Sequence, residues 1–151
     1  MPGRRAVSNQ MPKTKWTRVI AAGLLAGVVI NVSELALHRV LLGERWTAAF
    51  AALGKRPTGW TTFIPANFLV GYFVVWLYTR LQPHYGPGRR TALRAGMAIW
   101  AVFWVIPILA LVPLELFPNQ LLFLVIAGGV INANLAALLG AWVYKGDAPS
   151  R

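Results

Sequence analysis

The chain contains no cysteine among its 151 residues. That absence excludes disulfides, thiolate metal sites, haem attached through cysteine and thiol catalysis. Charged residues are also scarce, at 13% of the chain against roughly 25% in soluble proteins. Only four residues are acidic, whereas fifteen are Lys or Arg, so the formal net charge is +11. Hydrophobic residues make up 57% of the sequence, a balance typical of a membrane protein rather than of a soluble domain.

Four long apolar stretches are the main feature of the sequence. They cover about residues 19–41, 62–81, 92–114 and 120–144, and each reaches the roughly 20 residues that cross the hydrocarbon core as a helix. The sequence therefore predicts an all-α membrane protein with four transmembrane helices in a bundle. We expect one four-helix transmembrane domain over residues 16–146, after a disordered basic leader at 1–15 and before a short tail at 147–151.

Two of these stretches carry features that affect the helix itself. The first is longer than the apolar region of a signal peptide, and Glu34 interrupts the place where a small-residue cleavage site would stand. We therefore expect a signal-anchor helix that is retained. Pro107 interrupts the third stretch, which predicts a kink near its middle.

The basic residues are divided unequally between the two ends of the predicted helices. One side has eleven of them: Arg4, Arg5, Lys13, Lys15, Arg18, Arg80, Arg89, Arg90, Arg94, Lys145 and Arg151. The other side has four: Arg39, Arg45, Lys55 and Arg56. Because Lys and Arg are enriched in cytoplasmic segments, both termini are predicted to be cytoplasmic. These residues flank apolar runs rather than line a polar face, so the expected partner of the charge is the lipid bilayer and not nucleic acid.

The segment between the first two stretches predicts a short amphipathic helix. Trp46, Phe50 and Leu53 recur at i, i+4 and i+7 between Gly43 and Gly54. That spacing places the three side chains on one face of a helix. We expect this helix to lie on the outer surface, with its apolar face towards lipid.

Small and polar residues form a stripe along the first stretch. At about 100° per residue, Gly23, Gly27, Asn31, Glu34 and His38 fall within an arc of about 80°. Polar groups inside hydrocarbon usually face protein, and small residues four apart let two helix backbones approach closely. The stripe is therefore predicted to be a packing face that is polar in its middle and ionisable at its outer end.

The fourth stretch repeats part of the first. Residues 127–132 (A-G-G-V-I-N) match residues 26–31 (A-G-V-V-I-N) at five of six positions. Asn31 and Asn132 both fall near mid-membrane, each one turn after a glycine. We therefore expect the first and fourth helices to pack together, with these two amides within hydrogen-bonding reach. An inverted duplication like those of transporters and a chance similarity between helices rich in small residues both remain open.

The second and third stretches add polar residues at a similar depth. Asn67 shares a face with Gly71 in the second, and Glu115 lies at the outer end of the third. The candidate polar cluster therefore consists of Asn31, Glu34, His38, Asn67, Glu115 and Asn132. The candidate helix-packing glycines are Gly23, Gly27, Gly71, Gly128 and Gly140.

Three roles are open for the polar cluster. In a structural role, Glu34 pairs with a neighbouring polar side chain and locks the helices in register. In transport, Glu34 and His38 carry protons, a frequent use of ionisable residues inside membranes. In the third role, these two residues and Glu115 bind a metal ion or form an enzyme site. The sequence has no phosphate loop, nucleophile motif or H-E-x-x-H zinc motif.

We therefore predict a non-enzymatic structural or accessory membrane module, as a homo-oligomer or with another membrane protein as its partner. The alternative is a small transporter or proton-linked carrier that uses the Glu, His and Asn side chains of the cluster. No catalytic residue, metal site or cofactor is expected; His38 and His84 fall on opposite sides of the membrane, which argues against a b-type haem. Trp100, Phe103 and Trp104 are expected to pack against other helices or face lipid.

Two motifs resemble uncharacterised small bacterial integral membrane proteins with four predicted helices. They are A-G-x-x-x-N-x-x-E in the first stretch (Ala26, Gly27, Asn31 and Glu34) and Y-G-P-G-R-R-T-A-L in the turn from Tyr85 to Leu93. The resemblance covers the chain from about residue 17 onwards. It implies a multi-pass protein of the bacterial inner membrane and brings no particular activity with it.

Overall fold

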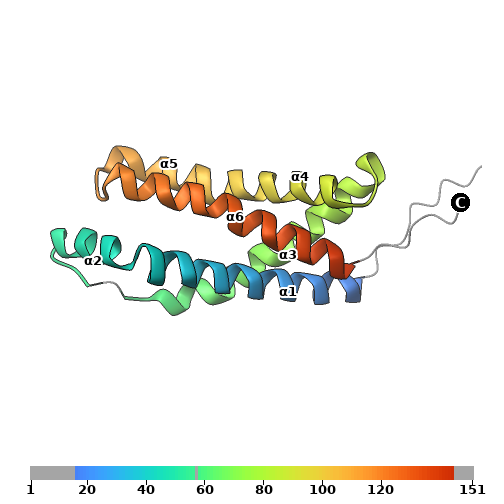
Figure 1. Cartoon of the computed structure of the whole chain (residues 1–151), viewed down its shortest axis with the longest axis horizontal. Helices are drawn as coiled ribbons and strands as arrows, with labels where there is room; N and C mark the ends of the chain where they lie inside the picture. The colour runs from blue at the N-terminus through green and yellow to red at the C-terminus, as the bar shows by residue number, and fades with distance from the viewer. Residues whose placement is uncertain (1–15, 57, 145–151) are drawn as a thin grey trace, which may run out of the picture.

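The computed structural model describes residues 16–56 and 58–144, which form helices and connecting turns without any strand (Figure 1). Four helices are long and apolar enough to cross a membrane: Trp16–Leu41, Phe63–Tyr85, Arg89–Leu114 and Asn119–Tyr144. The prediction of an all-helical chain with four candidate spans is thereby confirmed for the described residues. The predicted basic leader and the predicted tail lie outside them.

Two of the four long helices are built from more than one segment. The first consists of α1 (Trp16–Leu35) and the π-helical η1 (Ala36–Leu41), and α2 (Gly43–Ala52) follows it. A 3₁₀ turn, η2 (Trp60–Thr62), leads into α3 (Phe63–Tyr85). The third consists of α4 (Arg89–Trp100), the π-helical η3 (Ala101–Val105), α5 (Ile106–Leu111) and the 3₁₀ turn η4 (Val112–Leu114). The second, α3, and the fourth, α6 (Asn119–Tyr144), are each a single continuous α-helix.

The two π-helical segments differ in how far the sequence accounts for them. Pro107 has no N–H to donate to the carbonyl of Phe103, and the widened turn η3 ends two residues before it, at Val105. The interruption predicted at Pro107 therefore takes the form of a π-helical turn, which is one of the known causes of helix kinks. No proline lies in or near η1, so nothing local in the sequence predicts it.

The long helices lie side by side in a definite arrangement. α1 packs against α3 and α6, and α4 packs against α6 and α3. The start of α1, the end of α6 and the α3–α4 turn gather at one end of the molecule, here named the terminal end (Figure 1). α2 and the α5–α6 turn lie at the opposite end, named the α2 end.

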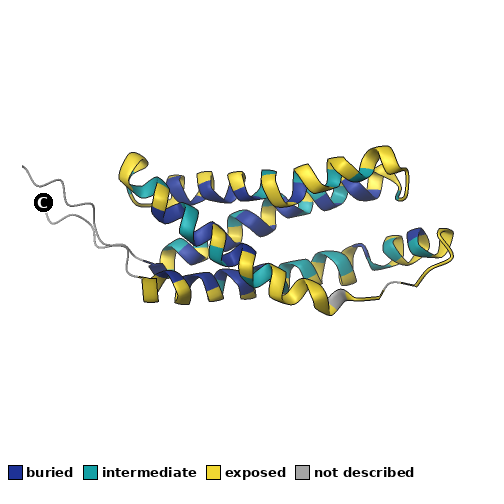
Figure 2. Cartoon of the chain, turned by 180° about the vertical axis from the view of Figure 1, so that it is seen from behind, coloured by how far each residue is buried: buried dark blue, intermediate teal, exposed yellow. Residues whose placement is uncertain are grey.

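Burial is concentrated towards the terminal end (Figure 2). The side chains that are fully buried there are mostly small, including Ala22, Ala26, Ala92, Ala95, Ala133 and Ala136. Small side chains let helix backbones approach closely. Close packing matters in a bilayer because lipid tails are as apolar as the helices, so the hydrophobic effect does not drive helices together. In contrast, η1, α5 and η4 contain no buried residue. The buried apolar residues at the α2 end are instead Leu42, Ala49 of α2, and Leu121 and Leu122 at the start of α6.

The five predicted packing glycines all lie at contacts with other helical segments. A Cβ atom built on Gly71 would lie 2.6 Å from the Cα of Gly27 and 2.7 Å from the carbonyl oxygen of Gly23. The Gly23–Gly27 pair thus faces α3 rather than α6, and the backbones of α1 and α3 meet there. Gly128 lies against Leu37 of η1, and Gly140 lies against Val75 of α3.

Candidate functional site

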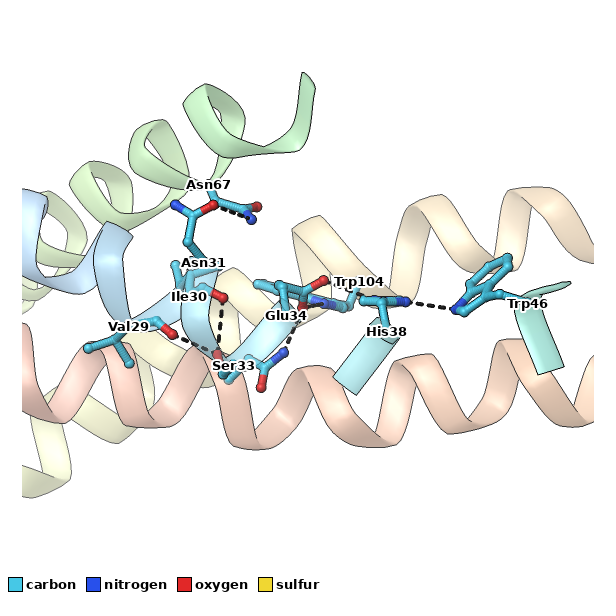
Figure 3. A network of polar contacts seen from close by, with 10 residues as sticks. Val29, Ile30, Asn31, Ser33, Glu34, His38, Trp46, Asn67 and Trp104 are labelled. Atoms are coloured by element: carbon cyan, nitrogen blue, oxygen red, sulfur yellow. Dashed lines mark hydrogen bonds and ion pairs between the residues drawn. The ribbon is translucent and has the colours of Figure 1, made fainter. Parts of the chain in front are cut away.

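The carboxylate of Glu34 accepts hydrogen bonds from side chains on three separate segments (Figure 3). Its Oε1 atom accepts from Asn132 Nδ2 of α6 at 2.6 Å and from Trp104 Nε1 of η3 at 3.1 Å. Its Oε2 atom lies 2.9 Å from His38 Nε2 of η1. One carboxylate thereby joins the first, third and fourth long helices.

A fourth side chain extends this network and determines where its protons lie. Trp46 Nε1 of α2 donates to His38 Nδ1 at 2.8 Å (Figure 3). An indole N–H can only donate, so Nδ1 of His38 carries a lone pair, and the single N–H of the neutral imidazole is on Nε2. That N–H donates to Glu34. The hydrogen bonds therefore run from Trp46 through a neutral His38 to an ionised Glu34. These three residues, together with Trp104 and Asn132, are named the Glu34 network.

Aromatic contacts hold Trp46 in this position. Its ring lies 5.4 Å from that of Phe117, in the turn between the third and fourth long helices, and 6.0 Å from that of Phe50. Phe50 also contacts Phe117, at 5.6 Å between ring centroids. On the face of α2 that was expected to point towards lipid, Trp46 and Phe50 thus contact protein and are half-buried. The physical reason is that a tryptophan with a protein acceptor for its N–H and an aromatic neighbour for its ring is better satisfied against protein.

Glycine makes room for the second tryptophan of the network. A Cβ atom on Gly129 would lie 2.5 Å from Cγ of Trp104, and the Trp104 side chain is only 7% exposed. The indole of Trp104 therefore reaches Glu34 across a glycine surface of α6. Sequence reasoning selected Gly128 and passed over Gly129, although the two are adjacent.

Asn31 and Asn67 form a separate amide pair. Asn67 Nδ2 donates to Asn31 Oδ1 at 3.3 Å, and Asn31 Nδ2 donates to the carbonyl of Gly27 at 2.9 Å. The predicted hydrogen bond between Asn31 and Asn132 is therefore wrong. The axial position of α6 places Asn132 beside Glu34, about one turn further along α1. The similar segments of the first and fourth helices consequently make different contacts.

Glu115 does not join the other acidic and imidazole groups. It is exposed and follows η4 in a left-handed backbone conformation, with φ of 49°. Within residues 16–56 and 58–144, no group of three or more His, Cys, Asp or Glu side chains is placed to hold a metal ion. The metal site considered for Glu34, His38 and Glu115 therefore has no geometric support among the described residues.

Sequence reasoning missed both tryptophans of the network. Trp104 was expected to pack or face lipid, and Trp46 was expected to face lipid. A signal was available in principle, because a carboxylate in an apolar span needs several hydrogen-bond donors. Indole N–H groups are among the few donors in the neighbouring spans, but the sequence does not tell which of them point at Glu34.

An open groove meets the network at the α2 end. His38 and Trp46 line it, together with the charged side chains of Arg39, Glu44 and Arg45. His38 therefore has one face in the groove while its Nε2 atom bonds to Glu34. The Glu34 carboxylate is therefore connected to the groove through the His38 side chain.

Comparison with known proteins adds no family to this picture. No protein-family model matches the chain, and neither a curated protein nor a solved structure matches it. The resemblance to small bacterial membrane proteins remains an expectation from two motifs. The interpretation of the site therefore depends on its geometry.

Proposed function

We propose that the chain is a multi-pass protein of the bacterial inner membrane with both termini in the cytoplasm. The orientation is supported by eleven of the fifteen Lys and Arg residues, which the sequence assigns to the side of the termini and of the α3–α4 turn. The contacts of α1 with α3 and α6, and of α4 with α6, support a four-helix bundle. In this orientation the α2 end is the outer end, and α2 is a surface helix whose aromatic residues point inwards.

Within that setting we propose a non-enzymatic membrane module in which the Glu34 network fixes the register of the helices. The observation that supports this role is that the donors to Glu34 come from three segments, through His38, Trp104 and Asn132. Hydrogen bonds between membrane helices contribute only about 0.6 kcal/mol each on average. Their main effect is therefore to specify one axial position of each helix, and with it one outer surface.

That surface is where the module meets a second copy or another membrane protein. The third long helix has only 11% of its most apolar stretch buried. Ile106 and Leu109 on α5 are 62% and 56% exposed. A helix held in register by Trp104 presents these side chains in one fixed arrangement, which suits specific packing against a partner helix.

A proton-linked carrier is the second candidate, and the position of His38 favours it. A proton from the groove would bind Nδ1 of His38, and the Nε2 proton would pass to Oε2 of Glu34. His38 then stays neutral but has its hydrogen on Nδ1, facing the N–H of Trp46. Two donors cannot bond to each other, so protonation of Glu34 would release Trp46 and loosen α2.

Glu34→Gln distinguishes the two candidates, because glutamine has nearly the same shape and cannot ionise. In vesicles under a membrane potential, the module predicts no proton uptake by the wild-type protein beyond that of protein-free vesicles. Uptake by wild type that is lost in folded Glu34→Gln and kept in Glu115→Gln would replace the module with the carrier. Glu115 is a suitable control because it is an exposed carboxylate outside the network.

The orientation is tested with single cysteines, since the natural chain has none. Thr58→Cys lies in the segment between α2 and η2, and Ser150→Cys lies next to the C-terminal residue of the sequence. A maleimide that cannot cross membranes should label Thr58→Cys on intact cells, and should label Ser150→Cys only after the membrane is opened. Labelling of Ser150→Cys on intact cells would overturn the proposed topology.

A further inference from the structure

A second groove lies between the second and third long helices, away from the Glu34 network. It is lined by Phe73, Trp76 and Leu77 of α3, Ile99 of α4 and Phe103 of η3. Its volume of about 210 Å³ is below the roughly 300–1,000 Å³ of pockets that enclose small molecules. Phe73 and Phe103 are 37% and 39% exposed, so the groove opens onto the surface that faces lipid. Its size and opening suit a slender apolar chain rather than a compact ring-shaped ligand.

Contacts among the aromatic rings define the wall of the groove. The rings of Phe73 and Phe103 are stacked, with centroids 6.3 Å apart and planes at 29°. Trp76 meets Phe73 edge to face, with centroids 6.5 Å apart and planes at 83°. Rings that are held by one another cost little conformational entropy when a ligand lies against them, because few rotamers remain to be lost.

A cation lies next to this apolar wall. The guanidinium carbon of Arg80 is 5.5 Å from the centre of the Trp76 ring, and Arg80 is exposed. Arg80 follows Trp76 by one helical turn, on the side of the terminal end. Arg89 and Arg90, both exposed, begin α4 after the short α3–α4 turn. A positive charge above an apolar groove is the arrangement that an anionic headgroup and its acyl chain require.

The distances along the helix agree with the depth of a lipid chain. At 1.5 Å per residue, Trp76 and Phe73 lie about 6 Å and 10 Å from Arg80 along α3. Half of the hydrocarbon core is about 15 Å thick. A phosphate beside Arg80 therefore leaves its acyl chain in contact with both rings.

We propose that this groove binds one acyl chain of an anionic phospholipid, whose headgroup phosphate pairs with Arg80. A zwitterionic lipid has the same chains and the same phosphate, but its own ammonium group offsets the attraction. One arginine near the membrane surface contributes enough to favour an anionic lipid by about fivefold. The site is independent of the role of Glu34, so it stands whether the protein is a module or a carrier.

The test uses phospholipids with brominated acyl chains, which quench tryptophan fluorescence on contact. The Trp76 signal is obtained as the difference between the wild-type protein and Trp76→Phe, in vesicles that contain a minor fraction of brominated lipid. Brominated phosphatidylglycerol should quench this signal with about fivefold higher apparent affinity than brominated phosphatidylcholine. Arg80→Gln should remove the preference, and Arg80→Lys should retain most of it.

Two matched controls separate a site from general attraction to a basic protein. Arg94, at the same end of the molecule, packs over Tyr85 at 4.2 Å, so Arg94→Gln removes one charge without touching the groove and should leave the Trp76 preference intact. Trp142, 64% exposed on α6, reports the lipid around the rest of the surface through Trp142→Phe. Equal preferences at Trp76 and Trp142, or equal losses with Arg80→Gln and Arg94→Gln, would overturn the proposal.

Discussion

Glu34→Gln gives the most direct test of how protons are arranged in the Glu34 network. The glutamine oxygen can still accept from Asn132 and Trp104, but its NH₂ group meets the N–H on Nε2 of His38. His38 could accept from that NH₂ group only by moving its hydrogen to Nδ1, which would break the bond from Trp46. The substitution therefore breaks one hydrogen bond and removes the charge from two others.

The size of the effect follows from these three bonds. A hydrogen bond to a charged group contributes about 1.5–3 kcal/mol and a neutral one about 0.5–1.5 kcal/mol. The Glu34 side chain is 20% exposed, and polar contacts between membrane helices are at the weak end of such ranges. We therefore expect the free energy of unfolding to fall by about 2 kcal/mol.

Reversible unfolding in mixed detergent micelles, followed by helicity, measures this change. Glu115→Gln should leave the unfolding free energy within about 0.5 kcal/mol of wild type, as surface substitutions usually do. A similarly small change for Glu34→Gln would refute the reasoning, since it would mean that Glu34 is already neutral in the folded protein.

A double-mutant cycle sharpens the same test. In Trp46→Phe the Nδ1 atom of His38 is released, so His38 can move its hydrogen there and accept from the new glutamine. Glu34→Gln should then cost at least about 1 kcal/mol less in the Trp46→Phe background than in the wild-type protein. Strict additivity of the two substitutions would contradict the relay from Trp46 to Glu34.

Two further predictions concern packing. Gly71→Ala should lower the free energy of unfolding by about 1–3 kcal/mol, because the new Cβ would press on the backbone of Gly27. Gly43→Ala is the control, because its Cβ would meet nothing closer than 3.9 Å. It should change the free energy of unfolding by less than about 1 kcal/mol. Trp46→Phe keeps a ring beside Phe117 but loses the bond to His38, so amide hydrogen exchange should rise across α2 and stay unchanged in α3. A uniform rise along the chain would show that Trp46 stabilises the whole fold and does not specifically hold α2.

Properties that depend on local composition could be predicted from the sequence. Residues 120–144 were expected to form a span, and α6 runs over Asn119–Tyr144. Gly71 was expected to lie at a helix contact and meets the backbone of Gly27. The length of an apolar run and the absence of a side chain act on the helix that contains them, so the sequence of that helix is enough to make such predictions.

Partner choice inside the membrane was predicted less well. Glu34 and His38 were placed together, because they are one turn apart on the same helix. The bond from Asn132 to Glu34 depends on the axial position of α6 against α1. If α6 were shifted by one turn along α1, Asn132 would lie beside Asn31, as predicted. Periodicity gives the angle of a residue around its own helix and says nothing about that shift.

The sequence by itself determined that this protein has four helices able to span a membrane, and it named the carboxylate at the centre of the network. Only the tertiary structure decided which donors surround Glu34 and that Trp46 turns inwards. The physical reason is that the two properties depend on different parts of the chain. The burial of an apolar run is set by its own residues. A hydrogen bond of about 3 Å between two helices forms only when the rotation and the translation of both helices match at the same time.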